Sequence, residues 1–232
     1  MGAFRRLVAF TGVLGTLSIG LAATPAGLVM TAAAAGGLCG LGPPPGPTQV
    51  LADQVSGLTA FAIFTSVVGT TETDIFVTGV EATVSSAGSQ PTPASSTQLG
   101  ITAFDTVTGI TSVEAFGCTS TPDLQIDRLL TSATLAPTSI TVFDSISNTS
   151  STTTVSADWT GVGDVNRSAD GGAFHSGNFT VTTRFVGFMR NAEATGSVSD
   201  PALGVSFAGP ASYAELDSFK NGAVQVCVGD SC

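Results

Sequence analysis

In two segments of the chain, residues 153–160 and 178–185, apolar residues and one threonine each occupy every second position. A period of two is that of a β-strand with one buried face, because successive side chains of a strand point to opposite sides. A helix would scatter the same residues around its circumference. Both segments are therefore predicted to be strands that share one core. Trp159 lies on the apolar side of the first strand, so we expect it in that core and not on a sugar-binding surface.

A nine-residue pattern occurs three times, starting at Phe61, Ile101 and Ile140. Each copy has phenylalanine at its fourth position, a β-branched residue at its seventh, and glycine or asparagine at its ninth. Glycine and asparagine tolerate the positive φ of a tight turn, and a second alternating run follows each copy. The pattern predicts three hairpins. Either duplication of one unit or shared turn chemistry would produce it.

Turn-forming residues elsewhere in the chain predict further strand ends. The pair Asn221-Gly222 favours a type I′ turn within a last hairpin that starts at Tyr213 and ends at Val228. Arg190-Asn191 is expected to form another turn, and Val205–Ala208 a short strand between two prolines.

Two segments between the repeats differ in character. Residues 83–98 are rich in Ser, Pro and Gln and are expected to be a loop, whereas apolar positions within residues 123–136 predict a further strand. The chain as a whole is predicted to be all-β, with about ten strands and no helix. A single antiparallel β-sandwich of the jelly-roll or Ig-like kind, built partly from hairpin repeats, is the favoured architecture. A propeller is the alternative, but a period of about 40 residues would give fewer than five blades.

The N-terminal segment resembles an export signal in its composition. Arg5 and Arg6 precede an uncharged stretch that ends in small residues at Ala33 and Ala35, which predicts a signal peptide over residues 1–35. An uncleaved membrane anchor is the alternative, although glycine and proline interrupt the apolar run. Residues 36–50, rich in proline and glycine, are predicted to be an extended lead-in. The β-sandwich domain is then expected over residues 51–232.

Charge limits the classes of partner. The 232-residue chain has 17 acidic and 7 basic residues, a formal net charge of −10, and two of the basic residues belong to the predicted signal peptide. An acidic protein repels nucleic acid and anionic lipid, so neither is expected as a partner, and no membrane contact is expected after cleavage. Only 10% of the residues are charged. A surface dominated by Ser, Thr, Gly and Asn suits a secreted, extracellular β-protein.

The four cysteines, Cys39, Cys118, Cys227 and Cys232, all follow the predicted cleavage site. An even number of cysteines in an exported chain predicts two disulfide bonds. Three connectivities remain open. No Cys-x-x-Cys pair is present and His175 is the one histidine, which disfavours a zinc site.

The segment between the two best-patterned strands, residues 161–177, is expected to be a long irregular loop and the main functional surface. Loops of this length in compact domains are usually binding elements or mobile connections. Alternating oxygen-bearing side chains would also suit calcium, although the order differs from that of an EF-hand; no other cofactor is expected. The loop gathers a mixture of donors and acceptors suited to a polar ligand: Asp164, Asn166, Arg167, Asp170 and His175.

No catalytic constellation stands out. Asp105 and Asp144 occupy the same place in two copies of the repeat, but an aspartate before a turn usually accepts hydrogen bonds from the turn amides. We therefore expect a non-enzymatic secreted protein that acts in surface attachment or binds a glycan or a cell-surface protein. The alternative is an extracellular hydrolase that cleaves a polymer with paired carboxylates, taken from Asp105, Asp144, Asp158 and Asp164.

Overall fold

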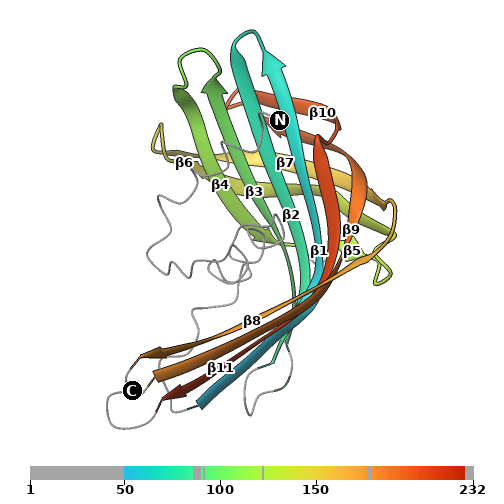
Figure 1. Ribbon diagram of the computed structural model, residues 1–232. Helices are drawn as coiled ribbons and strands as arrows, with labels where there is room; N and C mark the ends of the chain where they lie inside the picture. Colours follow the sequence, from blue (N-terminus) through green and yellow to red (C-terminus); the bar gives the residue numbers. More distant parts are fainter. Residues whose placement is uncertain (1–49, 86–89, 91, 122, 177–178, 228–232) are drawn as a thin grey trace. The chain divides into compact units, whose positions relative to one another are not determined.

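The computed structural model describes residues 50–85, 90, 92–121, 123–176 and 179–227 (Figure 1). The chain divides into two units, residues 1–37 and residues 38–232, and every described residue belongs to the second. The predicted signal peptide, and all of the predicted lead-in except Val50, lie outside the described residues. Within the described part, no helix is long and apolar enough to span a membrane.

Eleven antiparallel strands form one sheet in the described part of the chain, and this confirms the all-β prediction. No helix occurs among these residues. The strands are β1 (Val50–Val68), β2 (Thr71–Ser85), β3 (Thr92–Asp105), β4 (Thr111–Ser120), β5 (Gln125–Ile126), β6 (Ser132–Asp144), β7 (Thr149–Gly161), β8 (Asn166–Ser176), β9 (Phe179–Asp200), β10 (Val205–Pro210) and β11 (Tyr213–Cys227).

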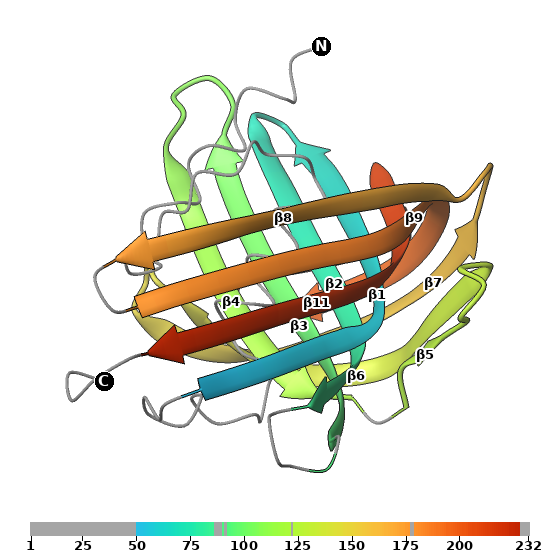
Figure 2. The same ribbon diagram turned by 60° about the horizontal axis from the view of Figure 1, so that its bottom comes forward.

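Eight of the strands pair in a closed circuit. Strands β9, β11, β1, β2, β3, β4 and β6 pair in that order, and β7 then joins β6 back to β9. Three strands lie outside this circuit: β5 pairs with β6, while β8 and β10 pair with β9. In Figure 1, β6 and β7 cross behind β2, β3 and β4 at a steep angle, which leaves two packed sectors of sheet. The halves of β1, β9 and β11 that pair with one another turn away from the direction of β2–β4, together with β8 (Figure 2).

The apolar core fills the space between these sectors. Its largest side chain is Trp159 on β7, which is 2% exposed and donates its indole N–H to the carbonyl oxygen of Phe61 at 3.0 Å. Phe64 on β1 packs against Phe207 on β10, with ring centroids 5.2 Å apart. The expected core position of Trp159 is confirmed. The alternation over residues 153–160 is confirmed as well, because Thr153, Val155, Ala157 and Trp159 of β7 are buried while the residues between them are not.

All three repeated hairpins are present. They are β1–β2, β3–β4 and β6–β7. The ninth residue of each copy has a positive φ: 63° at Gly69, 72° at Gly109 and 57° at Asn148. The faces differ, however, because Phe64 is fully buried while Phe143, at the same place in the third copy, is 48% exposed. The copies therefore share turn chemistry but not the face that they bury.

Two expected turns are wrong. Asn221 and Gly222 lie inside β11, where they pair with β9 on one side and β1 on the other. Arg190 and Asn191 lie inside β9. Pairing on both edges of a long strand outweighs a local turn preference. The Arg190-Asn191 position does mark a boundary, since β9 pairs with β11 up to Asn191 and with β7 from Ala192 onward.

Two further expectations need correction. The expected loop over residues 83–98 is largely strand, because β2 continues to Ser85 and β3 begins at Thr92. The expected strand over residues 123–136 is reduced to the two residues of β5 and the start of β6, with a turn between them. Apolar residues of this segment still enter the core, but at positions that do not alternate: Leu124, Ile126, Leu130, Ala133 and Leu135. The short strand at Val205–Ala208 is confirmed within β10.

Candidate functional site

The expected loop over residues 161–177 is wrong. Residues 166–176 form β8, which pairs antiparallel with residues 179–189 of β9, and only residues 162–165 remain as the link from β7. The glycines and the aspartate of β8 gave no alternation of polar and apolar residues from which a strand could be inferred. A strand that pairs along one side through its backbone needs no such pattern.

The five residues proposed for this loop do not gather at one point. Asp164 lies in the link and is exposed, and Asn166 and Arg167 begin β8. Asp170 and His175 lie further along the strand, opposite Phe185 and Thr180. His175 lies nine positions after Asn166, about 30 Å along an extended strand. Among the described residues, no group of three or more His, Cys, Asp or Glu side chains is placed to hold a metal ion.

The two disulfide bonds expected from the four cysteines remain a prediction. Cys118 lies on β4 opposite Gln98, and Cys227 ends β11 opposite Phe179. Cys39 and Cys232 lie outside the described residues.

The paired aspartates of the repeat serve as turn caps. Asp105 accepts hydrogen bonds from the amides of Val107 (2.9 Å) and Thr108 (2.6 Å). Asp144 accepts from the amides of Ile146 and Ser147, both at 3.2 Å, and from Glu114 on β4 at 3.0 Å.

A third aspartate of this kind was not anticipated. Asp200 accepts from the amides of Ala202 (3.0 Å) and Leu203 (3.1 Å), and from the hydroxyls of Ser151 and Thr153. Its sequence signal was the spacing of four residues to Gly204, which has φ 68°. The same spacing links Asp105 to Gly109 and Asp144 to Asn148.

The other two aspartates considered for a hydrolase, Asp158 and Asp164, lie on β7 and in the link after it, and both are exposed. The four carboxylates thus belong to different turns and strands.

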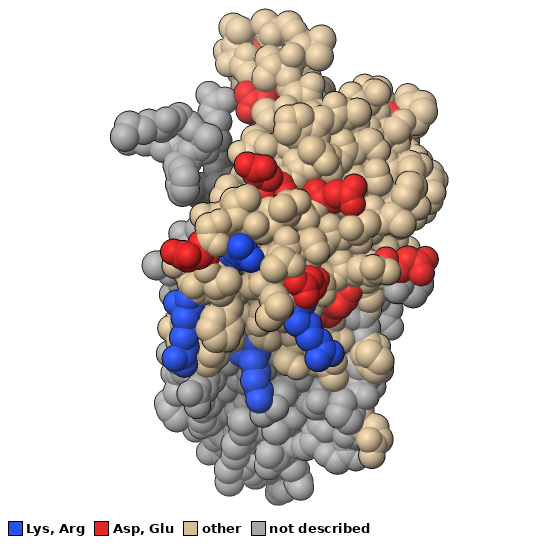
Figure 3. All heavy atoms as spheres, turned by 90° about the vertical axis from the view of Figure 1, so that its right-hand side faces the viewer, with Lys and Arg blue, Asp and Glu red and all other residues tan. Residues whose placement is uncertain are grey.

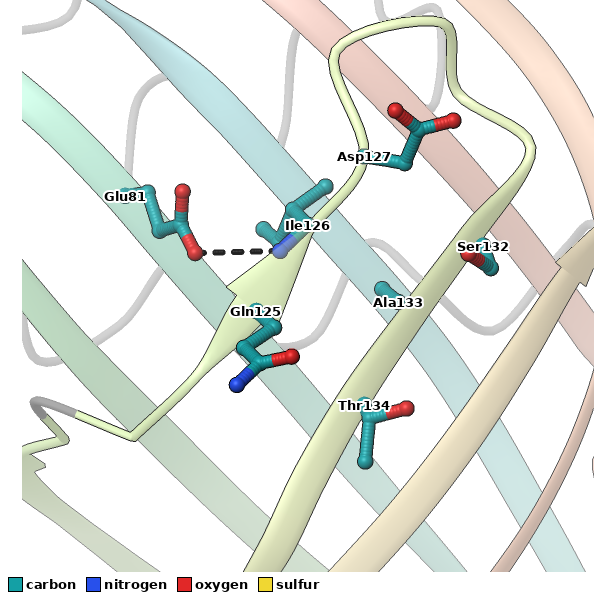
Figure 4. A pocket seen from close by; sticks show the side chains of 7 residues that line it. All are labelled: Glu81, Gln125, Ile126, Asp127, Ser132, Ala133 and Thr134. Carbon is teal, nitrogen blue, oxygen red and sulfur yellow. Dashed lines mark hydrogen bonds between the residues drawn. The ribbon is translucent and has the colours of Figure 1, made fainter.

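A shallow pocket of about 380 Å³ opens beside β5 (Figure 4). Glu81 on β2 reaches across to it and accepts a hydrogen bond from the amide of Ile126 at 3.0 Å. Asp127 at its rim accepts a short hydrogen bond from Thr131. Both carboxylates have partners within the protein, and the pocket is wide open, so it offers little enclosure for a ligand.

A buried carboxyl pair on β11 is the chemically most unusual feature of the described chain. Glu215 is 0% exposed, and its Oε2 accepts a short hydrogen bond from the hydroxyl of Tyr213. Asp217 follows two residues later and is half-buried. Residues two apart on a strand share a face, with Cα atoms about 6.6 Å apart. The tyrosine ring packs edge-on against Phe61, with centroids 6.1 Å apart.

Burial shifts the ionisation of this cluster. It raises the pKa of Asp217 to about 8, and the negative charge of Glu215 adds to the shift. Burial also raises the pKa of Glu215, while the hydrogen bond from Tyr213 opposes this rise. The pKa of Tyr213 is raised by burial, then by its hydrogen bond to Glu215 and the nearby carboxylates. At neutral pH the Asp217 carboxyl is therefore mostly protonated.

The cluster belongs to a larger set of residues on one side of the sheet, most of them buried, which we call the polar face. Glu215 pairs with Phe61, Phe61 with Thr78, and Thr78 with Gln98, and directly paired residues of a sheet point to the same side. The next row contains Asp217, Thr59, Val80 and Ser96. This side is opposite to the apolar core, which receives the alternate residues Ala60, Ala62, Ala214 and Leu216.

The polar face leaves hydrogen-bonding capacity unused. Within the described part of the chain, three buried side-chain oxygens have no partner: Ser96 Oγ, Thr102 Oγ1 and Glu215 Oε1. Ser96 and Glu215 are each 0% exposed. Thr102 lies six residues after Ser96 on β3, and it points to the same side of the sheet because successive residues of a strand alternate. A buried oxygen without a partner costs about 1–3 kcal/mol, so each one calls for an explanation.

Sequence reasoning missed this site because Tyr213–Phe219 alternates polar and apolar residues, and its polar side reads as a solvent-facing side. The available signal was subtler. Two carboxylates stand between Tyr213 and Phe219 on one face, in a chain where charged residues are scarce.

Comparison with known proteins gives no relative: no protein family matches the sequence, and no curated protein resembles it significantly. The chemistry of the polar face must therefore carry the functional argument.

Proposed function

We propose that this protein is a secreted, non-enzymatic binding protein that holds a hydroxyl-rich ligand of the glycan class on its polar face. The observation that carries the proposal is the set of three buried oxygens without a partner, Ser96 Oγ, Thr102 Oγ1 and Glu215 Oε1, on one side of one sheet. Sugar hydroxyls both donate and accept hydrogen bonds, so they suit a carboxylate and side-chain hydroxyls alike. Ser96 and Thr102 lie about 20 Å apart along β3, so a ligand that reaches all three oxygens is an oligosaccharide of several units.

The apolar residues of the polar face also suit a sugar. Phe61 and Tyr213 are half-buried next to Glu215. Aromatic rings offer an apolar surface to the C–H groups of a sugar ring, while neighbouring polar groups fix its orientation. The acidic chain favours a neutral or cationic glycan over an anionic one.

The proposal includes an architecture. Strands β1–β4 and strands β6–β7 act as the two layers of a β-sandwich of the jelly-roll or Ig-like kind, with the apolar core between them. The ligand then lies on the side of the first layer that faces away from the core, where it displaces the groups that bury Glu215 and Ser96. Surface attachment through a glycan or a glycosylated cell-surface protein is the expected biological role.

The test is a glycan-array screen followed by calorimetry with the best oligosaccharide. Glu215→Gln and Ser96→Ala should each weaken binding about tenfold or more, because a hydrogen bond to a buried group is lost. Asp158→Asn, an exposed change on β7, is the matched control and should bind like the parent protein. Equal affinity for all four proteins would refute the proposal, and so would a screen with no binding at all.

A hydrolase is the second candidate, and the raised pKa of Asp217, about 8, favours it. A carboxyl that is protonated at neutral pH beside a second carboxyl is the arrangement that supplies a general acid and a base. Asp217→Asn distinguishes the two functions. A hydrolase would lose release of reducing ends while still binding the glycan, whereas a binding protein releases none in either form.

A further inference from the structure

Three hairpin turns of the sheet carry bare aliphatic side chains at their tips. Val68 is 77% exposed at the β1–β2 turn, Val107 and Ile110 are 78% and 68% exposed at the β3–β4 turn, and Ile146 is 52% exposed at the β6–β7 turn. Phe116 and Phe143, which pair directly between β4 and β6, are also about half exposed. We call this set, together with Val67, the apolar ridge.

Hydrogen bonds join neighbouring turns of the ridge. The Thr70 hydroxyl donates to Asp105 at 2.5 Å, and the Thr106 amide donates to the Thr70 carbonyl oxygen at 2.7 Å. On the other side, the Ser145 amide donates to the Glu114 carbonyl oxygen at 2.9 Å, beside the Glu114–Asp144 bond. The apolar tips are therefore held in place before any partner arrives, which lowers the entropy cost of docking.

The charges along the ridge are negative. Asp105 ends β3 at the second turn, Glu114 lies on β4, and Glu72 is the second residue of β2, next to the first turn. Hydrogen bonds from Thr70 and from the Thr108 amide lower the pKa of Asp105 to about 2, so it remains ionised. No described Lys or Arg lies in these turns. An anionic membrane is a poor match for such a surface.

Among the residues whose exposure the structure describes, the other exposed large apolar side chains lie near cations. They are Leu129, Val165 and Phe188. Arg167 pairs with Phe188 between β8 and β9, and Arg190 donates to the carbonyl oxygen of Gly163 at 3.1 Å. Figure 3 shows the described Lys and Arg side chains near one another on one face, with Asp and Glu side chains bordering them and continuing above them. We call the set of Arg128, Arg167, Arg190 and Lys220 with these three apolar residues the cationic patch. Asp127 and Asp164 lie in the same segments, so its charge is mixed.

The two surfaces lie at opposite ends of one hairpin. The β6–β7 turn at residues 145–148 belongs to the ridge, whereas residues 128–131 and 161–165, at the other end of the same two strands, belong to the patch or adjoin it. Twelve residues of extended strand separate these ends, about 40 Å. Surfaces so placed cannot meet within one molecule.

We propose that the apolar ridge of one copy of this chain docks on the cationic patch of another. The evidence is the division of the exposed large apolar residues of the described chain into two separated sets. One set is bordered by carboxylates, and the other is bordered by four Arg and Lys side chains with Asp127 and Asp164 among them. Complementary surfaces at two ends of a molecule form a head-to-tail contact, which continues to further copies or closes into a ring. Apolar contact supplies the affinity, and the opposite charges select the partner.

The first test is sedimentation of the purified protein, with its N-terminus defined by intact mass, over a range of concentrations. The average mass should rise with concentration and fall when salt is raised from 50 mM to 500 mM, because salt screens the charges. A monomer at every concentration would overturn the proposal, and association that salt leaves unchanged would contradict the role of the charges.

Variants make the test specific. The ridge variant Val68→Ser/Val107→Ser and the patch variant Phe188→Ser/Lys220→Glu should each remain monomeric alone. An equimolar mixture should form a one-to-one dimer, because each variant retains the surface that the other lacks. Thr195→Ser, an exposed change outside both surfaces, should associate like the parent. Far-UV circular dichroism and Trp159 fluorescence establish that each variant is folded. Two monomeric variants that fail to combine would refute the head-to-tail contact.

Discussion

The carboxyl groups of this protein have lowered or raised pKa values according to the groups that surround them. Burial opposes ionisation of Asp144 and Asp200, but hydrogen bonds from hydroxyls and turn amides outweigh it and lower the pKa of each. On the polar face, burial dominates, and the pKa values of Glu215 and Asp217 are raised. The same residue type therefore stays charged at a turn and holds its proton on the polar face.

This contrast predicts an unusual dependence of stability on pH. Unfolded Asp217 loses its proton near pH 4, whereas folded Asp217 keeps it up to about pH 8. The folded state therefore binds more protons between these values, and the free energy of unfolding should fall as pH rises from 4 to 8, by up to about 1.4 kcal/mol per pH unit. Glu215 acts in the same direction. The turn aspartates act below pH 4, where acid removes their contribution.

Urea unfolding followed by Trp159 fluorescence at pH 5, 6, 7 and 8 measures this effect. Asp217→Asn, which cannot ionise, should flatten the profile, while Asp158→Asn should not change it. A wild-type profile that rises across this range would show that Asp217 is ionised in the folded protein.

At the scale of elements, local chemistry predicted the turns well and the long strands poorly. Gly69, Gly109 and Asn148 marked real turns because positive φ is a property of the residue itself. Asn221-Gly222 carried the same signal inside β11, where two neighbouring strands hold it extended. Such pairing joins residues far apart in the sequence, and no local pattern reports it.

The candidate site also depends on pairing between distant residues, which the local sequence does not report. The sequence indicated that Tyr213–Phe219 alternates, but not that its polar side is buried. Burial of Glu215 depends on neighbours brought in by β1, whose residues lie about 150 positions earlier, as Phe61 does. A carboxylate on an alternating strand is usually solvent-facing, so the local pattern favoured the wrong environment.

Close packing around Gly196 on β9 predicts that any larger residue there will destabilise the fold. A Cβ atom at Gly196 would lie 2.6 Å from Cζ of Phe64 and 2.8 Å from the carbonyl oxygen of Ser156. Gly196→Ala should therefore lower the free energy of unfolding by about 1–3 kcal/mol, as overpacking does.

Gly209→Ala is the matched control on the neighbouring strand β10, because its Cβ would approach no atom closer than 3.5 Å. Thermal unfolding by calorimetry compares the two variants. Equal melting temperatures would show that β1 and β9 can move apart at little cost.

At the scale of the whole molecule, the acidic charge and the four cysteines support the proposal of a secreted protein. Export predicts a mature N-terminus at Gly36, after cleavage that follows Ala35, and two disulfides predict no free thiol. Intact mass of protein from the culture medium and thiol titration in denaturant check both expectations. Full-length protein retained in the membrane, or thiols released without reductant, would contradict them.

On this proposal the polar face, and no other part of the described chain, holds the ligand. Chemical-shift mapping of ¹⁵N-labelled protein, titrated with the best oligosaccharide from the array, tests it most directly. We expect shifts of the amides of residues 59–61, 96–98, 101–103 and 213–217, while those of β8 and of the pocket beside β5 stay unchanged. Shifts centred on residues 166–176 or on Glu81, Gln125 and Asp127 would contradict the account and place the ligand elsewhere.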